Sequence, residues 1–490
     1  MNAAVALAAL AARRGWGARP AYHCDGRTWT HAQVHDLAAR AADELRRRGV
    51  RPGLRVLLAM PDGIGWVVSF LAVARLGAVS VLVDPALSAA EHRHMAVDSA
   101  AQLAIIQTDD GRFDGVAAVL PVDRLLAATV IAIPAAARLV PDSDPLYVQY
   151  TSGTSGAPKG VVHRHGDLAT YAAAVGWRVL GLRCADVGLS MTGLYCAYGL
   201  GNSLAFPLCT GSSVVLLGDR RCPGDVHEAA ARYGVTVLYG VPSAYADLLR
   251  DRRSEAFGPV RVAVSAGAAL PTPLATRTAA YLGAPVLDQI GSTAVGNSFC
   301  ANSIHHNEPG TVGRPVPGYQ LEVRDDGGRV LGDDTEGQLW VHGPSAMIEF
   351  LGRPRETAET LVDGWIATHD RAVRQPDGTY LHRGREDDVE VVSGVSVSPL
   401  EIEALMRTHP SVRDVAVAAV PDLAGTSVLQ AFVVADGSDP RLDDLPRELI
   451  CLARGRLSGH AVPRSVRLVS DLPRTSTGRL CRRVVRDGAW

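Results

Sequence analysis

The chain of 490 residues carries 49 Lys plus Arg against 51 Asp plus Glu, with 47% hydrophobic and 20% charged residues. This near-neutral balance gives no basic excess for capturing nucleic acid, and it is the composition of a folded globular protein rather than a disordered one. Because one hydrophobic core seldom grows beyond about 250–300 residues, we expect two or more domains.

The cysteines and the apolar segments indicate the compartment. The eight cysteines are scattered, without a Cys-x-x-Cys pair or the spacing of a zinc site, so we expect reduced thiols. No stretch approaches the roughly 20 apolar residues of a spanning helix, and the first charges follow the apolar N-terminal run instead of preceding it. The sequence therefore predicts a cytoplasmic monomer or homodimer without nucleic-acid or membrane partners.

Apolar runs alternate with helical periodicity through the first three quarters of the chain. The early pattern predicts helices over residues 34–48 and 66–76 and strands over 55–60 and 78–83. Alternation of this kind is typical of parallel sheets covered by helices. We therefore expect an α/β fold.

The pattern changes at the charged segment 384–388, which predicts a large N-terminal domain of residues 1–386 and a small α+β domain of residues 387–490. Ser398 and Glu401 form a capping-box pattern with Pro399 at the first helical position, predicting a helix to about residue 409. Strands are expected over 415–420 and 428–434, followed by a helix over 445–457.

The strongest local signal is the segment from Thr151 to Gly160, Thr-Ser-Gly-Thr-Ser-Gly-Ala-Pro-Lys-Gly, directly after a predicted strand at 146–150. Glycines expose backbone N–H groups, hydroxyls add donors, and Lys159 adds a positive charge, a combination suited to a polyphosphate. Lys159 is the single Lys among 49 basic residues, so a chain-wide preference for Arg has spared this position. The alternative is a Gly/Ser/Thr-rich surface loop.

This segment resembles the phosphate-binding loop of the ANL superfamily, which comprises acyl-CoA synthetases, peptide-synthetase adenylation domains and luciferases. The similarity extends over essentially the whole chain through several motifs in order. Segments 197–202 and 396–403 are closest to benzoate-type aryl-CoA ligases. The resemblance implies ATP and Mg²⁺ as cofactors, a thiol of CoA or phosphopantetheine as acceptor, and a C-terminal domain that moves.

The resemblance also implies the nucleotide site. Lys159 would neutralise the β- and γ-phosphates, Thr293 would lie near the α-phosphate, and Arg479 would bridge the reacting oxygens. Asp370 would accept hydrogen bonds from the ribose hydroxyls with support from Arg385; taken alone, Asp370 is better explained as a turn residue. The implied ATP-binding residues are Thr151, Ser152, Gly153, Thr154, Ser155, Gly156, Ala266, Gly267, Asp288, Gln289, Ile290, Gly291, Ser292, Asp370 and Arg385.

By the same resemblance Tyr198 packs on the ring of an aromatic acid, Asp387 is the hinge of the small domain, and Gly394 lets the pantetheine arm approach. Cys196 would narrow the entrance of the acid pocket; alternatively, it is a small thiol of the core. Alternatively, Tyr198 is a buried structural residue. The implied acid-binding residues are Cys196, Ala197, Tyr198, Gly199, Gly291, Asn297 and Ser298.

Three departures from the family pattern stand out. Ala294 replaces the usual Glu that helps to hold Mg²⁺, so the metal ligands are unknown, and Arg479 replaces the usual Lys. Gly296 is expected to widen the acid pocket, while Asn297 and Ser298 add donors and acceptors for a ring with hydroxyl or amino substituents.

These observations predict an ATP-dependent, AMP-forming ligase that activates an amino- or hydroxy-substituted benzoate or cinnamate and passes it to CoA or to the thiol of an acyl carrier protein. Two alternatives stay open. One is a diazotase-like enzyme that activates nitrite for attack by an aryl amine. The other is a nucleotide-binding protein in which Ala294 and Arg479 mark impaired catalysis.

Overall fold

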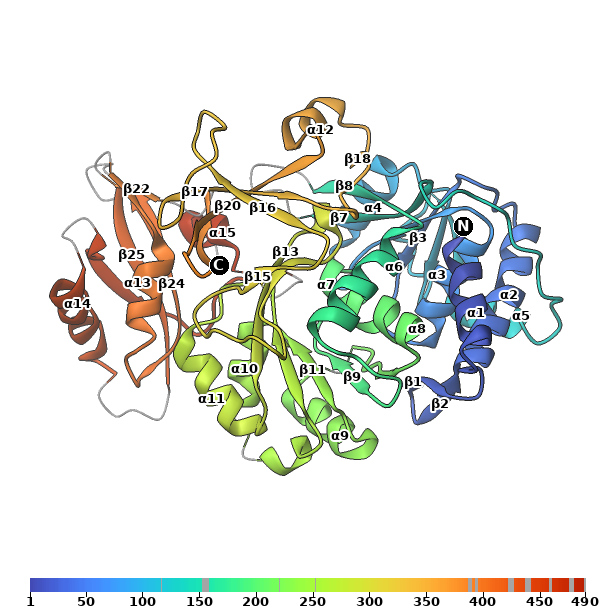
Figure 1. The fold of residues 1–490 in the computed structure, drawn as a ribbon, viewed down its shortest axis with the longest axis horizontal. Helices are drawn as coiled ribbons and strands as arrows, with labels where there is room; N and C mark the ends of the chain where they lie inside the picture. The colour runs from blue at the N-terminus through green and yellow to red at the C-terminus, as the bar shows by residue number, and fades with distance from the viewer. Residues whose placement is uncertain are drawn as a thin grey trace. The chain divides into compact units, whose positions relative to one another are not determined.

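The computed structural model describes residues 1–115, 117–151, 158–219, 221–251, 253–386, 390–392, 395–421, 427–436, 442–457, 461–475 and 480–488. The chain forms two compact units, residues 1–321 with 340–368 and residues 322–339 with 369–490 (Figure 1). No helix within the described residues is long and apolar enough to cross a membrane.

A seven-stranded sheet in the first unit carries the phosphate-loop strands. Five of its strands pair in parallel, and β8 and β18 close one edge in antiparallel pairing. In order across the sheet the strands are β18 (Glu349–Phe350), β8 (Lys159–Arg164), β7 (Pro145–Thr151), β4 (Val79–Leu82), β3 (Arg55–Ala59), β5 (Leu103–Ile106) and β6 (Ala118–Pro121).

A nine-stranded sheet forms the rest of the first unit's β structure. Its central strands β10, β9, β11, β12 and β13 are parallel, so their carboxyl ends meet at one edge. The order is β15 (Arg314–Pro315), β14 (Ser298–Ala301), β13 (Val286–Gly291), β12 (Val262–Ser265), β11 (Val237–Gly240), β9 (Val187–Ser190), β10 (Ser213–Val215), β1 (Pro20–Cys24) and β2 (Arg27–Thr30).

Helices cover both faces of β11–β13 (Figure 1). Leu238, Ala263 and Val286 are cross-strand neighbours, and they pack in one core cluster with residues of α9, α10 and α11. The next residue of β11, Tyr239, faces the other side, where the rings of Tyr198 and of Phe206 in α8 pack against it. The sheet is therefore buried on both faces, as parallel sheets are.

The helices of the first unit include short 3₁₀ and π helices of three to eight residues, labelled η. They are α1 (Ala3–Arg13), α2 (His31–Arg47), α3 (Ile64–Arg75), α4 (Ala89–Asp98), α5 (Val122–Ala128), α6 (Asp167–Tyr171), η1 (Ala172–Val179), α7 (Ala197–Leu200), η2 (Gly201–Ala205), α8 (Phe206–Thr210), α9 (Pro223–Tyr233), α10 (Pro242–Leu248), η3 (Ser254–Phe257), α11 (Thr272–Leu282), η4 (Thr293–Val295) and α12 (Pro354–Thr360).

The remaining strands and helices belong to antiparallel or mixed sheets and to the C-terminal part of the chain. A five-stranded sheet contains β16 (Gln320–Arg324), β17 (Glu336–His342), β20 (Trp365–Arg374), β19 (Leu361–Val362) and β21 (Tyr380–Arg385). The others are β22 (Glu390–Val392) with β23 (Val395–Val397), the sheet of β24 (Val412–Pro421), β25 (Ser427–Ala435) and β26 (Ser465–Leu468), and helices α13 (Pro399–Met406), α14 (Leu445–Arg456) and α15 (Arg482–Asp487).

The α/β class with a separate C-terminal domain is confirmed, and the early elements α2, β3, α3 and β4 lie within a few residues of the predicted bounds. The capping box at Ser398 is wrong. Ser398 does precede α13, but its side chain makes no capping hydrogen bond, and the helix ends at Met406. The 386/387 boundary stays a prediction; residues 369–386 group with the second unit, and 387–389 lie outside the described residues.

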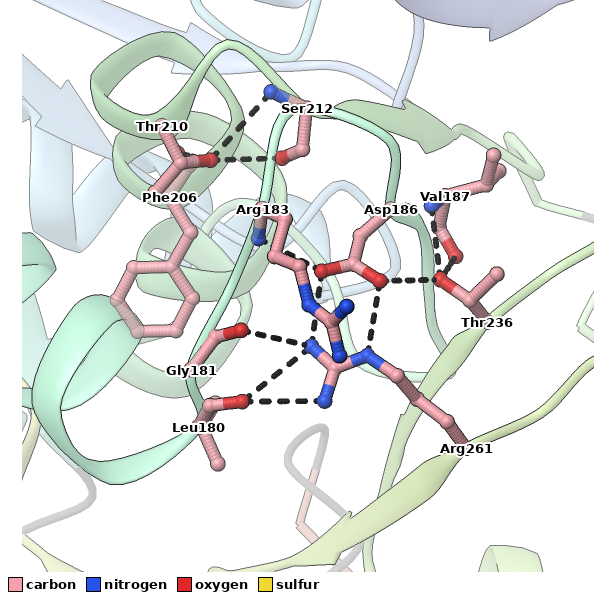
Figure 2. Close-up of polar contacts among 10 residues, drawn as sticks. All are labelled: Leu180, Gly181, Arg183, Asp186, Val187, Phe206, Thr210, Ser212, Thr236 and Arg261. Carbon is pink, nitrogen blue, oxygen red and sulfur yellow. Dashed lines mark hydrogen bonds and ion pairs between the residues drawn. The ribbon is translucent and has the colours of Figure 1, made fainter. Parts of the chain in front are cut away.

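A buried ion pair fixes the amino ends of the central strands (Figure 2). The Asp186 carboxylate, just before β9, accepts hydrogen bonds from Arg261 Nε at 2.9 Å and Nη2 at 2.8 Å, from Thr236 Oγ1 at 2.9 Å and from Arg183 N at 2.7 Å. Burial acts to raise the pKa of Asp186, but these donors hold it below its ordinary value. The loops before β9, β11 and β12 are thereby joined through one carboxylate.

We predict that Arg261→Ala lowers the free energy of unfolding by about 2–3 kcal/mol, because it leaves the buried Asp186 charge without its cation. Urea denaturation monitored by circular dichroism measures the loss. Arg355→Ala is the control, since its ion pair with Glu359 is exposed and should contribute nothing measurable. Equal stability of the two variants would contradict the role of the Asp186 pair.

Candidate active site

The phosphate loop connects two neighbouring antiparallel strands. Thr151 at the end of β7 is the cross-strand partner of Lys159 at the start of β8, so the predicted loop begins and ends at the same place on the sheet edge. Lys159 Nζ lies 5.5 Å from the centroid of the Phe350 ring. Residues 152–157, and with them Ser152, Gly153, Thr154, Ser155 and Gly156, lie outside the described residues, so their contacts with phosphate stay predictions.

The predicted adenine-binding residues lie at the carboxyl ends of β12 and β13. Gly240, Ser265 and Asp288 are cross-strand neighbours there, and Ala266 N donates to Gly240 O. Gly267 has a φ of +86°, a conformation that favours glycine. Burial raises the pKa of the Asp288 carboxyl well above its ordinary value. The parallel register therefore brings these two predicted segments to one edge.

The turn after β13 holds Thr293. Gly291 must be glycine, because a Cβ there would lie 2.6 Å from Asn297 O. The chain then forms η4, and Gly296 N donates to Ser292 O at 3.0 Å. The Ser292 hydroxyl is buried without a hydrogen-bond partner among the described residues, which suits a site completed by a ligand.

The structure corrects the interpretation of Gly296 as a residue that widens the acid pocket. Its φ is +83°, and a Cβ at this position would lie 3.1 Å from His163 Cε1 and 3.4 Å from the Tyr147 hydroxyl. The space beside Gly296 is therefore already filled by two aromatic side chains, and glycine serves to admit them.

The turn provides no carboxylate ligand for a metal. The Ala294 side chain cannot bind a cation, and its carbonyl oxygen accepts a hydrogen bond from Met347 N at 2.8 Å. Among the described residues, no group of three His, Cys, Asp or Glu side chains could hold a metal ion. A metal site built from protein side chains alone is thus missing from this part of the chain, and we assign no catalytic step to Mg²⁺.

The predicted acid-binding segment packs over β11 and β12. Tyr198 in α7 donates its hydroxyl to Val264 O at 2.9 Å, and its ring meets Tyr239 edge-on at 6.3 Å. Gly199 passes so close to Gly193 O that a Cβ would lie 2.0 Å away. Cys196 Sγ donates to Gly193 O, and burial raises the pKa of this thiol to about 11, consistent with a small core thiol.

Asn297 and Ser298 use their polar groups within the protein. Asn297 Nδ2 donates to Ala197 O at 3.4 Å, and Ser298 Oγ donates to Gln289 Oε1 at 2.9 Å. The donor left over from this pairing is Gln289 Nε2, which is buried and has no partner in the part of the chain that the structure describes. Direct contact of Asn297 and Ser298 with the acid stays a prediction.

Two groups of residues near this segment were missed from the sequence. One is Asn202, whose buried side chain interacts with the Tyr198 hydroxyl. The other is Asp62, which accepts hydrogen bonds from Leu194 N and pairs with Arg221 at 2.9 Å. Asn202 stood in the quoted 197–202 motif, but nothing in the sequence joins Asp62 to Arg221.

The predicted ribose-binding residues lie in the second unit. Asp370 in β20 and Arg385 in β21 are cross-strand partners, and His382 Nε2 lies 3.1 Å from Asp370 Oδ1. Arg385 Nε is buried without a hydrogen-bond partner among the described residues. Asp370 is therefore a strand residue, not a turn residue. Asp387, Gly394 and Arg479 lie outside the described residues and keep their predicted roles as predictions.

Comparison with known proteins identifies the family. The family model described as AMP-binding enzyme matches residues 10–351, and that described as AMP-binding enzyme C-terminal domain matches residues 401–479. The p-hydroxybenzoic acid–AMP ligase FadD22 of Mycobacterium tuberculosis (strain ATCC 25618 / H37Rv) is 38% identical, over 99% of this chain and 68% of the relative.

Two solved structures share the fold over nearly their whole length. A benzoate CoA ligase from Burkholderia xenovorans LB400 has a TM-score of 0.92 at 32% identity, covering 99% of this chain and 100% of its own. The anthranilate CoA ligase AuaEII in complex with anthranoyl-AMP has a TM-score of 0.91 at 28% identity, covering 99% and 97%. The resemblance to benzoate-type ligases is confirmed.

The buried Asp62 carboxyl should make the stability of the protein depend on pH. Burial raises its pKa to about 6 despite Arg221. Between the ordinary pKa and about 6 the unfolded chain loses this proton while the folded chain keeps it, so Asp62 makes folding less favourable as pH rises through that window. Relative to Asp62→Asn, wild-type stability should fall by about 2–3 kcal/mol from pH 4 to pH 7. Urea denaturation across this range measures it, and parallel curves would contradict the burial of an ionisable Asp62.

Proposed function

The chain belongs to the AMP-binding enzyme family, and we propose that it activates a hydroxyl-bearing aryl acid and passes the acyl group to the thiol of CoA or of a carrier-protein phosphopantetheine arm. The carboxylate oxygen attacks the α-phosphorus of ATP, and the bond to the β-phosphate oxygen breaks to release pyrophosphate. The thiolate then attacks the acyl carbon of the adenylate, and AMP leaves with its phosphate oxygen.

The substrate assignment rests on the buried amide donor of Gln289, with a second amide, Asn202, nearby. Gln289 is 3% exposed and its Nε2 has no hydrogen-bond partner among the described residues, whereas the side chain of Asn202, 2% exposed, interacts with Tyr198. A buried donor left unpaired costs about 1–3 kcal/mol, so native proteins seldom keep one without a use. An oxygen on the ring of the acid would accept this hydrogen bond.

The position of the two amides fits an aromatic acid. Strand alternation puts Gln289 on the same face of the sheet as Leu287, whose cross-strand neighbour is Val264. The Tyr198 hydroxyl donates to Val264 O, and the Tyr198 ring packs against Tyr239 on this face. Asn202 lies beside Tyr198. A ring packed on Tyr198 would therefore have both amides near its substituents.

Amide donors also distinguish between substituents. A phenolic oxygen accepts a hydrogen bond readily, whereas an aryl amine is chiefly a donor. We therefore favour hydroxybenzoates and hydroxycinnamates over their amino counterparts. Similar proteins include a p-hydroxybenzoic acid–AMP ligase and an anthranilate CoA ligase, so acids with either substituent occur among the relatives.

The nucleotide would be held electrostatically. Lys159 meets the β- and γ-phosphates, Thr293 and Arg479 meet the reacting oxygens, and Asp370 with Arg385 holds the ribose. Mg²⁺, when bound to ATP, neutralises phosphate charge. No side chain of this chain needs to act as a nucleophile.

We predict that pyrophosphate release with 4-hydroxybenzoate or 4-hydroxycinnamate exceeds that with the unsubstituted acid by about tenfold or more in kcat/KM, because the unsubstituted ring leaves Gln289 Nε2 unpaired. A coupled pyrophosphate assay with hydroxy-, amino- and unsubstituted acids, with and without CoA, measures this. Release with nitrite and an aryl amine but with no acid would favour the diazotase-like alternative. No release under any condition would leave only a nucleotide-binding protein.

Lys159 should be required for the first half-reaction. We predict that Lys159→Ala lowers kcat/KM for ATP by about 10²–10³-fold, since it removes the one ammonium group at the phosphate loop. The kcat/KM for ATP of Lys159→Arg should lie between those of wild type and Lys159→Ala, because a planar guanidinium keeps the charge but not the compact shape of an ammonium group. Circular dichroism controls for folding. Wild-type turnover of Lys159→Ala would refute the assignment of the phosphate site.

A further inference from the structure

Donors from other parts of the chain hold the turn that carries Thr293 by hydrogen bonds to its carbonyl oxygens. Thr293 O accepts a hydrogen bond from His163 Nε2 at 2.7 Å, Ala294 O from Met347 N at 2.8 Å, and Val295 O from Ser345 Oγ at 2.7 Å. All of these residues belong to the first unit. Three successive peptide groups are thus fixed by three donors from outside the turn; Thr293 O also accepts a hydrogen bond from Gly296 N within the turn, at 3.1 Å, so His163 is its donor from another element.

The His163 imidazole lies between two acceptors. Its Nε2 faces Thr293 O, and its Nδ1 lies 2.9 Å from Asp167 Oδ2. Asp167 Oδ2 also accepts a hydrogen bond from Arg164 N at 3.0 Å, which fixes the position of this carboxyl group. A carbonyl oxygen can only accept, so the contact with Thr293 O requires the proton on Nε2, while Nδ1 faces Asp167.

The packing around His163 allows little movement. The ring is 0% exposed and stacks on Tyr147 at 5.0 Å between centroids. Gly296 leaves room for it, because a Cβ there would lie 3.1 Å from Cε1. Asp167 begins α6 and is fixed in turn by Arg164 N. A histidine needed only to fill the core would not need a carboxyl partner and a glycine shaped to it.

We propose that His163 is a positioning residue for adenylation: oriented by Asp167, it donates Nε2–H to Thr293 O and so fixes where the Thr293 hydroxyl meets the α-phosphate. This inference rests on the proposed function, which places Thr293 at that phosphate. It also accounts for how the turn keeps its geometry with Ala294, because the contacts that hold it are made to its main-chain carbonyl oxygens and not to a side-chain carboxylate.

Two isosteric variants separate positioning from simple structural support. In Gln, Nε2 takes the place of the histidine Nε2 and can still donate to Thr293 O. In Asn, Nδ2 takes the place of Nδ1 and can reach only Asp167. Both remove the imidazole ring, so a purely structural role for His163 would make the two variants equally defective.

We expect His163→Asn to lower kcat for acid-dependent pyrophosphate release by about tenfold while KM for the acid changes less than twofold, and His163→Gln to stay within about threefold of wild type. Equal losses in the two variants, or a loss confined to the KM of the acid, would overturn the inference. A wild-type enzyme that releases no pyrophosphate with any acid would instead refute the proposed function, and this inference with it.

A second measurement tests the geometry without turnover. Nuclear magnetic resonance of the protein labelled with ¹⁵N-histidine, with the His163→Gln spectrum for assignment, should show a proton on His163 Nε2. An Nε2 without a proton would overturn the inference.

Discussion

The parallel pairing of β11, β12 and β13 is the constraint from which the site follows. Parallel strands end at a common edge, so Gly240, Ser265 and Asp288 become neighbours although long stretches of chain separate them. The loops that leave this edge carry Ala266, Gly267 and Thr293. A ligand can therefore contact all of these loops at the edge although each loop is short. Open parallel sheets generally bind ligands at the carboxyl ends of their strands.

The two edges of this sheet treat polar groups in opposite ways. At the amino ends the Asp186 carboxylate is fully hydrogen-bonded to donors from three segments, and its burial is thereby tolerated. At the carboxyl ends Gln289 Nε2, Ser292 Oγ and Ser265 Oγ are buried without partners in the described part of the chain. The first edge is satisfied within the protein, and the second holds polar groups that are available to a bound molecule.

Elements with strong periodicity could be predicted from the sequence, and pairings over long distances could not. The apolar run of β3 and the helical pattern of α2 depend on neighbours in the chain, so their bounds were close. Ser398 failed because a capping pattern shows only that a hydrogen bond is possible. His163 reaches Thr293 across 130 residues, and Asp62 reaches Leu194 across 132, contacts for which local patterns contain no information.

The difference between local patterns and long-range contacts also explains why the sequence and the structure lead to different interpretations of Ala294. In the sequence it is a lost side-chain ligand, and the natural inference is a weakened site. In the structure its peptide group is one of three that external donors hold, with Met347 N on Ala294 O itself. A turn restrained through its main chain keeps its shape whatever side chain it carries. Loss of a carboxylate there changes the charge that the site offers to a metal, and leaves the position of Thr293 to His163 and its neighbours.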